Sequence, residues 1–364
     1  MRTLLLLPWL GACDLLKEIG DDSSSTLLTE EGEVVTEDGV ATVEVKIDSV
    51  ETAFMITADG EHFVSVDEII NPSGETVLHW SDWTSTNLNL TSAIYPSATE
   101  MVLNWPVRAE DGRVSKGTWK VILSAVNAEG RYQSGSKIKL TVQTKDDADF
   151  KNATVNVRLV YADGVGEMAE VREAMEAGIE RWREIWAPYG LTPVVRTESS
   201  SFDPDLPYPG EGSEEIYDLV MDSYEDELTM IVGETIRGGT DYLGVAGGIP
   251  GTLTANTRSA VVVSWLAGAG VDGTFQDTDI TILGETMAHE VGHYMGLFHP
   301  VEQSWDSWDA CDDTPDCSSE AGCTEKLGDN LMFPTPVCDF DGCIEQDQLS
   351  GVQEEILHRY TGAL

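Results

Sequence analysis

The residue pattern with the clearest chemical meaning is a cluster of histidines near residue 290. His289, Glu290 and His293 are followed by His299, so half of the 6 histidines lie between residues 289 and 299. Residues four apart share one face of a helix, so the imidazoles of His289 and His293 can reach the same metal ion. Zinc accepts nitrogen ligands in tetrahedral geometry, and the pattern therefore predicts a zinc site.

The neighbouring residues supply a third ligand and a base. Gly296 can adopt the left-handed conformation that ends a helix, and this turn would let His299 approach the metal from outside the helix. Three protein ligands leave one tetrahedral position for water, and Glu290 could take a proton from that water. The alternatives are a structural zinc without hydrolysis and three histidines without a metal.

The elements that must position this motif follow an α/β pattern from residue 152 to the end. Strands are expected at 155–161, 191–196, 228–232 and 260–265, and a helix over about 280–295 carries the histidines. A second helix presents one apolar face, formed by Met168, Val171, Met175, Gly178, Trp182 and Ile185. Alternating strands and helices predict an α/β domain.

The extended motif resembles the metzincin zinc metallopeptidases, and the resemblance covers roughly residues 152–364. It implies a mixed, twisted sheet, peptide-bond hydrolysis and a methionine-containing turn beneath the metal. Met332, in the segment Asp329-Asn330-Leu331-Met332-Phe333, takes that role by resemblance. The alternative is that Met332 simply fills a gap in the core.

Within the metzincins, the closest pattern is that of the pappalysin group. Leu243-Gly244-Val245-Ala246 resembles its edge-strand region. The stretch from Cys311 resembles its disulfide-bearing lower subdomain, which implies calcium ligands at Asp312, Asp313 and Thr314; a solvated turn is the alternative. Two residues depart from the pattern. Pro300 follows the third histidine as in serralysins, and Pro334 stands where many relatives have a tyrosine, so we expect no tyrosine assistance from that position.

The preceding residues, 35–148, have a different pattern. Apolar and polar residues alternate over short stretches separated by turn signals such as Asn71-Pro72-Ser73-Gly74, which predicts an all-β sandwich. This half weakly resembles the jelly-roll P domain of proprotein convertases, although any immunoglobulin-like sandwich could give the same pattern. The acidic segment 145–149 is the expected boundary. We expect the sandwich to act as a spacer or to recruit substrate; covering the cleft is the alternative.

The N-terminus has the pattern of a targeting segment. One arginine, a short apolar run and Leu10-Gly11-Ala12-Cys13 resemble a bacterial lipoprotein signal peptide over residues 1–12, which implies a lipid on Cys13. An ordinary secretory signal or a misplaced start would give a similar pattern. Residues 13–34 are rich in acidic residues and serine, and we expect a flexible tether there.

The remaining five cysteines are clustered, which in an exported chain suggests disulfides. An odd number predicts two bridges and one free thiol, and the pairing cannot be read from the sequence. A cysteine-ligated zinc site is the alternative, but it lacks a Cys-x-x-Cys pair. The candidates are Cys311, Cys317, Cys323, Cys338 and Cys343.

The charge balance limits the kinds of partner that the protein could bind. The chain has 65 Asp+Glu against 21 Lys+Arg, a net charge of −44, which disfavours nucleic acids and anionic membrane surfaces. We therefore expect an exported, monomeric zinc endopeptidase of the bacterial cell envelope or the extracellular space, attached to a membrane only through Cys13. Peptides would bind along an edge strand near 243–257. The rival functions are a surface-anchored adhesion lipoprotein with a degenerate peptidase domain and a small-molecule metallohydrolase.

Overall fold

The computed structural model describes residues 26–48, 53–146, 150–210, 213–221, 223–224, 226–270, 273–339 and 342–364. The predicted signal peptide, the lipidation site at Cys13 and the first part of the predicted tether lie outside these residues. No helix in the described ranges is long and apolar enough to span a bilayer.

The flexible tether predicted up to residue 34 is wrong from residue 26 onward. Strand β1 (Thr26–Val35) pairs antiparallel with β9 (Lys137–Asp146) along its whole length. Leu27 and Val34 pack against the hydrophobic core. The acidic composition suggested a solvated segment. The prediction failed because the strand that pairs with these residues lies far along the chain and leaves no local signal in the sequence.

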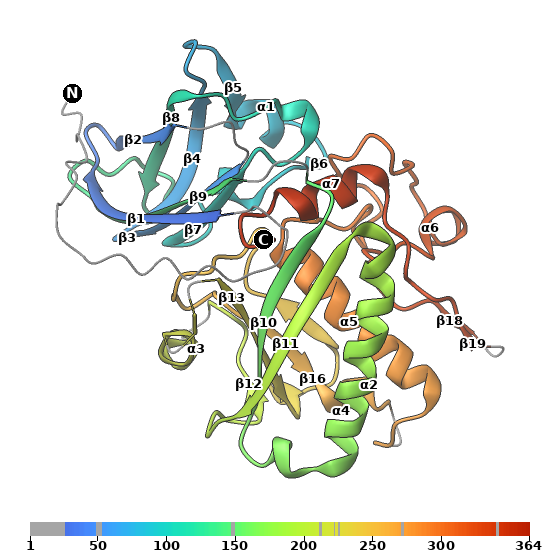
Figure 1. The fold of residues 1–364 in the computed structure, drawn as a ribbon. Helices are drawn as coiled ribbons and strands as arrows, with labels where there is room; N and C mark the ends of the chain where they lie inside the picture. Colours follow the sequence, from blue (N-terminus) through green and yellow to red (C-terminus); the bar gives the residue numbers. More distant parts are fainter. Residues whose placement is uncertain are drawn as a thin grey trace.

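The N-terminal half consists of two four-stranded antiparallel sheets (Figure 1). Besides β1 and β9, its long strands are β2 (Val40–Ile47), β3 (Ala53–Gly60), β4 (Phe63–Ile70), β5 (Thr76–His79), β7 (Glu100–Trp105) and β8 (Gly117–Val126). The sheet orders are β1-β9-β3-β7 and β2-β8-β4-β5. The ring centroids of Phe54 on β3 and Trp119 on β8 lie 5.9 Å apart, so the sheets share a core. The alternating pattern predicted such packed sheets, whereas the likeness to a jelly roll stays a prediction.

The C-terminal half contains a five-stranded sheet with helices against it. Its strands are β10 (Ala153–Tyr161), β11 (Leu191–Ser199), β13 (Glu227–Gly233), β15 (Gly244–Ala246) and β16 (Val261–Ser264). They lie in the order β11-β10-β13-β16-β15. All neighbours are parallel except β15, which runs antiparallel to β16 at the edge. The sheet is therefore mixed, as the resemblance implied.

Two long helices pack side by side in this half, α2 (Ala169–Trp186) and α5 (Asp277–Tyr294) (Figure 1). Helix α2 buries Val171, Met175 and Trp182, as its apolar spacing predicted. Met168, predicted for the same face, is instead exposed because it caps the helix from outside. Helix α5 is almost entirely buried from Leu283 to its end, which gives its side chains fixed positions.

The remaining elements are short. In the N-terminal half they are α1 (Trp80–Thr84), β6 (Leu88–Asn89), η1 (Ser92–Ile94) and η2 (Ala109–Asp111). In the C-terminal half they are η3 (Val165–Glu167), η4 (Ala187–Tyr189), β12 (Asp205–Leu206), α3 (Glu214–Val220), β14 (Thr235–Ile236), α4 (Trp265–Gly268), β17 (Trp308–Asp309), α6 (Glu320–Leu327), β18 (Cys338–Asp339), β19 (Gly342–Cys343) and α7 (Gly351–Arg359).

The two halves share one continuous hydrophobic core, which contains residues from both sheets of the sandwich and from α2 and α5. Strand β6 of the first half pairs in parallel with β17 of the second. The C-terminus lies between the halves, where Leu364 exchanges two backbone hydrogen bonds with Thr154 of β10 (Figure 1). The sandwich is thus packed onto the α/β half along the side that holds the C-terminal helix.

Candidate metal centre

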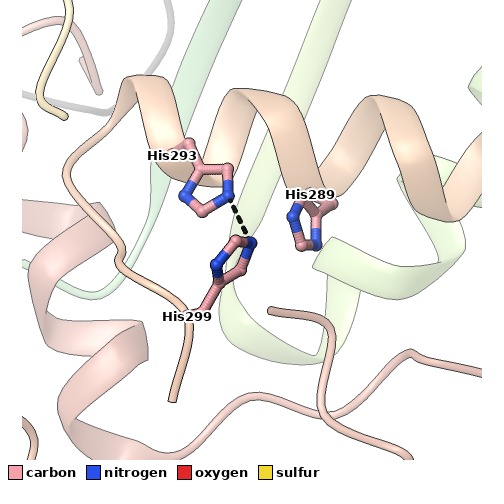
Figure 2. A group of neighbouring side chains, drawn as sticks. All are labelled: His289, His293 and His299. Atoms are coloured by element: carbon pink, nitrogen blue, oxygen red, sulfur yellow. Dashed lines mark hydrogen bonds between the residues drawn. The ribbon is translucent and has the colours of Figure 1, made fainter. Parts of the chain in front are cut away.

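The three predicted ligands meet at the end of α5 (Figure 2). His289 and His293 lie one helical turn apart, and one nitrogen of each of these residues and of His299 lies within 4.8 Å of the others. Helix α5 ends at Tyr294, and Gly296 has a φ of 116°, a conformation that favours glycine. The chain therefore turns back and presents His299 to the helix, as the spacing predicted.

Each imidazole is held from behind through its Nδ1 atom. The Nδ1 of His289 lies 2.7 Å from the carbonyl oxygen of Leu331, and that of His293 lies 2.6 Å from the carbonyl of Leu297. The Nδ1 of His299 lies 2.8 Å from a carboxylate oxygen of Glu302. Because all three partners are acceptors, Nδ1 carries the proton, and the Nε2 lone pairs point toward one another.

Burial keeps the imidazoles of the helix neutral. It lowers the pKa of His289 to about 3 and lowers the pKa of His293. The Nε2 atoms of His293 and His299 are 3.1 Å apart (Figure 2), and with protons on Nδ1 neither can donate to the other. Two facing lone pairs at this distance repel unless a cation lies between them. The donor set therefore fits a divalent transition metal such as zinc.

Glu290 is the acid nearest in sequence to these ligands, and its side chain is buried beside the edge strand. The backbone N–H of Ala246 on β15 donates to its carboxylate. Burial raises the pKa of Glu290 to about 8, and the Ala246 hydrogen bond opposes this rise. A Cβ atom on Gly244 would lie only 2.6 Å from Cγ of Glu290, so the glycine makes room for the acid.

The histidines and Glu290 open onto a cleft of about 560 Å³. Its lining includes β15 with the residues before it, and the segment from Leu331 to Pro336. The pairing of Leu243 with Ser264 and of Gly247 with Ala260 directs alternate backbone groups of β15 toward β16. The N–H and C=O groups of Gly244 and Ala246 therefore point away from the sheet. The Ala246 N–H donates to Glu290, while the N–H and C=O of Gly244 and the C=O of Ala246 are placed where an extended chain could pair with them.

The methionine turn lies directly under the histidine helix. Met332 is fully buried, and its Sδ is 2.8 Å from the place where a Cβ on Gly292 would be. Leu331, the residue before it, supplies the carbonyl that holds His289. The Oδ1 of Asn330 accepts a hydrogen bond from the Met332 N–H at 2.9 Å, which fixes the turn. This packing is what both interpretations of Met332 predict, the core residue and the turn beneath the metal.

Several cleft residues were not found from the sequence. Glu302 follows His299 by three residues, and this spacing alone did not indicate that its carboxylate contacts the imidazole. Tyr208 and Tyr242 line the cleft and stack edge to face with ring centroids 5.3 Å apart. Neither belongs to a local motif, because each is brought to the cleft by a separate loop. Pro334, where the sequence departs from the pattern that it resembles, also lines the cleft.

The candidate calcium ligands have other partners. The Asp313 carboxylate accepts from Ser350 Oγ at 2.7 Å and from Val352 N at 3.0 Å, and so caps α7. Thr314 Oγ1 donates to Asp309 at 2.6 Å, and Asp312 is exposed. Among the described residues, the histidine triad alone forms a cluster of three or more metal-ligating His, Cys, Asp or Glu side chains. Calcium binding stays a prediction.

The predicted count of two disulfides and one free thiol is confirmed. Cys317 pairs with Cys323 and Cys338 with Cys343, while Cys311 is buried and free. Burial raises the pKa of the Cys311 thiol well above its usual range, so it stays protonated. Two disulfides are typical of an oxidising environment outside the cytosol.

No family model and no curated protein matches the sequence. Among solved structures, metalloproteinase-II from Bacteroides fragilis is similar over 65% of this chain and 65% of its own, at 12% identity and a TM-score of 0.33. Archaemetzincin from Methanopyrus kandleri is similar over 58% of this chain and 88% of its own, at 15% identity and a TM-score of 0.29. The chain thus spans slightly less than two thirds of the first of these proteins. At such TM-scores the likeness does not establish a shared function.

Proposed function

We propose that this protein is a zinc-dependent endopeptidase. The observation that carries the proposal is the position of Glu290. Its carboxylate lies in the same cleft as the three histidines and is hydrogen-bonded to Ala246 of the edge strand. A purely structural metal site has no use for a buried acid in that position, because burying a carboxylate destabilises the fold.

His289, His293 and His299 would hold zinc through their Nε2 atoms. Bound zinc would act as a Lewis acid toward water and the scissile carbonyl. Glu290 would accept the proton of the attacking water at a carboxylate oxygen and pass it to the nitrogen of the leaving amine. A base must be ionised, and a divalent cation nearby favours the ionised form against the effect of burial.

An extended peptide is the substrate that best fits the cleft. The N–H and C=O of Gly244 and the C=O of Ala246 would pair with the main chain of the substrate, and the segment from Leu331 to Pro336 would also contact it. Main-chain pairing selects a polypeptide over a small ester or sugar. This preference argues for a peptidase over the small-molecule hydrolase.

The test is Glu290→Gln, which keeps the side-chain volume and removes the base. We expect casein cleavage to fall by about 10²–10⁴-fold while zinc content stays at one per chain. Glu173→Gln, an exposed acid on α2, is the matched control and should cleave normally. Cleavage at the wild-type rate by the Glu290→Gln variant would refute the assignment. A zinc-loaded wild type without proteolysis would favour the adhesion lipoprotein instead.

We also propose the finer features that the sequence motifs suggest: export, a lipid on Cys13, and kinship with the pappalysin group. The two disulfides support export. Expression with a clickable palmitate analogue tests the lipid. Wild type should incorporate the label and Cys13→Ser should not; equal labelling of both would contradict the anchor.

A further inference from the structure

The segment that follows the edge strand is held by the sandwich of the other half. Residues 247–260 connect β15 to β16, and Ile249 within this segment lines the cleft. The carbonyl oxygen of Ile249 accepts two hydrogen bonds from Ser92 of η1, from the backbone N at 3.0 Å and from Oγ at 2.7 Å. A cleft residue is thus fixed in place by a residue 157 positions earlier in the chain.

A second contact links the sandwich to the histidine helix through the same segment. Thr57 Oγ1 of β3 lies 2.6 Å from Thr252 Oγ1, and both side chains are buried. The carbonyl of Thr252 accepts a hydrogen bond from the hydroxyl of Tyr294, the residue after His293. Thr252 therefore connects the sandwich on one side with the end of α5 on the other.

A third contact is charge-assisted. The Glu100 carboxylate at the start of β7 accepts from Thr257, from the backbone N at 3.3 Å and from Oγ1 at 3.0 Å and 2.8 Å. Hydrogen bonds to a carboxylate are stronger than those between neutral groups. The three contacts, from Ser92, Thr57 and Glu100, are spaced along the segment and leave it little freedom to move.

The rest of the interface shows that the sandwich is not a detachable spacer. Asn104 of β7 is buried, donates to the carbonyl of Arg359 at 2.9 Å and accepts from the N–H of Thr361 at 2.9 Å. The ammonium of Lys145 on β9 is buried and donates to the carbonyl of His358 at 2.8 Å. Separation of the halves would break these hydrogen bonds and expose a shared core, so the contact is permanent.

We propose that the sandwich supports the edge-strand side of the substrate cleft from outside the cleft, and that Ser92 and Glu100 are positioning residues for the edge strand. They lie outside the cleft lining and would act by fixing residues 249–257, which set the end of β15 against which a peptide pairs. The expected effect on substrate binding rests on the proposed peptidase activity. The restraint of residues 249–257 by the sandwich does not depend on that activity. The proposal replaces the expectation of a spacer or recruitment role.

The test uses full-length Ser92→Ala, Glu100→Ala and the double variant. Glu33→Ala is the matched control, because Glu33 is an exposed acid on β1 at the other edge of the same sheet. Hydrogen exchange is followed by mass spectrometry in peptides covering 244–257. Loss of one or two net hydrogen bonds predicts about tenfold faster exchange in these peptides of the double variant, and the control should show no increase in the exchange rate.

Kinetics supply the second readout, with a quenched fluorescent peptide taken from a site that the wild type cleaves in casein. We expect KM to rise about fivefold and kcat to stay within twofold, because the loosened strand weakens pairing with the substrate while the histidines and Glu290 keep their places. Glu100→Gln keeps an acceptor oxygen and should restore much of the wild-type KM. A drop in kcat alone, or failure of this rescue, would overturn the positioning role.

The outcomes separate the two proposals. Unchanged exchange at 244–257 in a folded double variant overturns the inference, and so does a uniform increase across the whole chain, which would indicate general destabilisation. Local exchange at 244–257 with a higher KM supports it. A wild type that binds zinc but cleaves no casein overturns the proposed function, and the exchange experiment then decides the fixing of the segment by itself.

Discussion

Substitution of Gly244 by alanine should disable the proposed base without touching a metal ligand. The added Cβ would lie 2.6 Å from Cγ of Glu290, 3.1 Å from Cδ and 3.2 Å from Oε1. Ordinary contacts between carbon atoms are about 3.5–4.0 Å, so the side chain must move by roughly 1 Å. Glu290 has little space for such a shift, because it is buried and hydrogen-bonded to Ala246.

The size of the effect follows from this displacement. A misplacement of about 1 Å in a catalytic group can lower the rate about 100-fold, which corresponds to about 2.7 kcal/mol of transition-state stabilisation. Overpacking costs about 1–3 kcal/mol of folding free energy, partly offset by about 0.4–1 kcal/mol from the stiffer unfolded chain. We therefore expect a folded variant with kcat lowered between about 10- and 100-fold.

The assay combines kcat and KM on a fluorogenic peptide, zinc content by mass spectrometry and thermal unfolding. Gly239→Ala is the matched control, because its Cβ would have nothing closer than 3.8 Å. The control should keep kcat within twofold, and both variants should hold one zinc. If Gly244→Ala unfolds normally, binds zinc and keeps the wild-type kcat, then Glu290 does not act from the position described.

Three further predictions concern metal affinity, pH and stability. Glu302→Ala removes the acceptor behind His299 and should weaken zinc binding about 10–100-fold in competition with a chelating dye, and unchanged affinity would contradict this role. Burial raises the pKa of Glu285 to about 7, so the folded state keeps a proton that the unfolded chain loses above its lower pKa. Glu285 should therefore contribute a loss of about 3 kcal/mol of stability as pH rises from about 4.5 to 7, and urea titrations should show a loss smaller by about this amount for Glu285→Gln than for the wild type. Replacing Cys317 and Cys323 together by serine should cost about 2 kcal/mol in the same titration, since the bridge closes a short loop; an unchanged midpoint would argue against the bridge.

Local patterns predicted the elements that carry their own periodicity. The apolar spacing of α2 placed Val171 and Trp182 in the core. Alternation likewise predicted that residues 35–148 form packed β-sheets. The strand before these residues was missed. Residues 26–35 form a strand only through pairing with residues 137–146, which leaves no trace in the local sequence.

The candidate site shows the same difference between features set by local sequence and features set by distant residues. The spacing of His289, His293 and His299 predicted three converging imidazoles, because a helical turn and a glycine turn are local structures. Some of the groups that orient the imidazoles lie far from the histidines in the sequence. Leu331 comes from a distant turn, and its role is that of a backbone carbonyl, which any residue type could supply.

The sequence by itself determined the ligand set, the adjacent acid and the alternation of strands and helices, since these depend on residue type and on spacing within a few turns. The tertiary structure alone decided which backbone groups face the cleft, how Gly244 and Ala246 hold Glu290, and that the sandwich fixes residues 249–257. Such contacts join residues far apart in the chain through main-chain atoms and shape. They leave no residue pattern, because their energy depends on distances that exist only after the two halves have packed together.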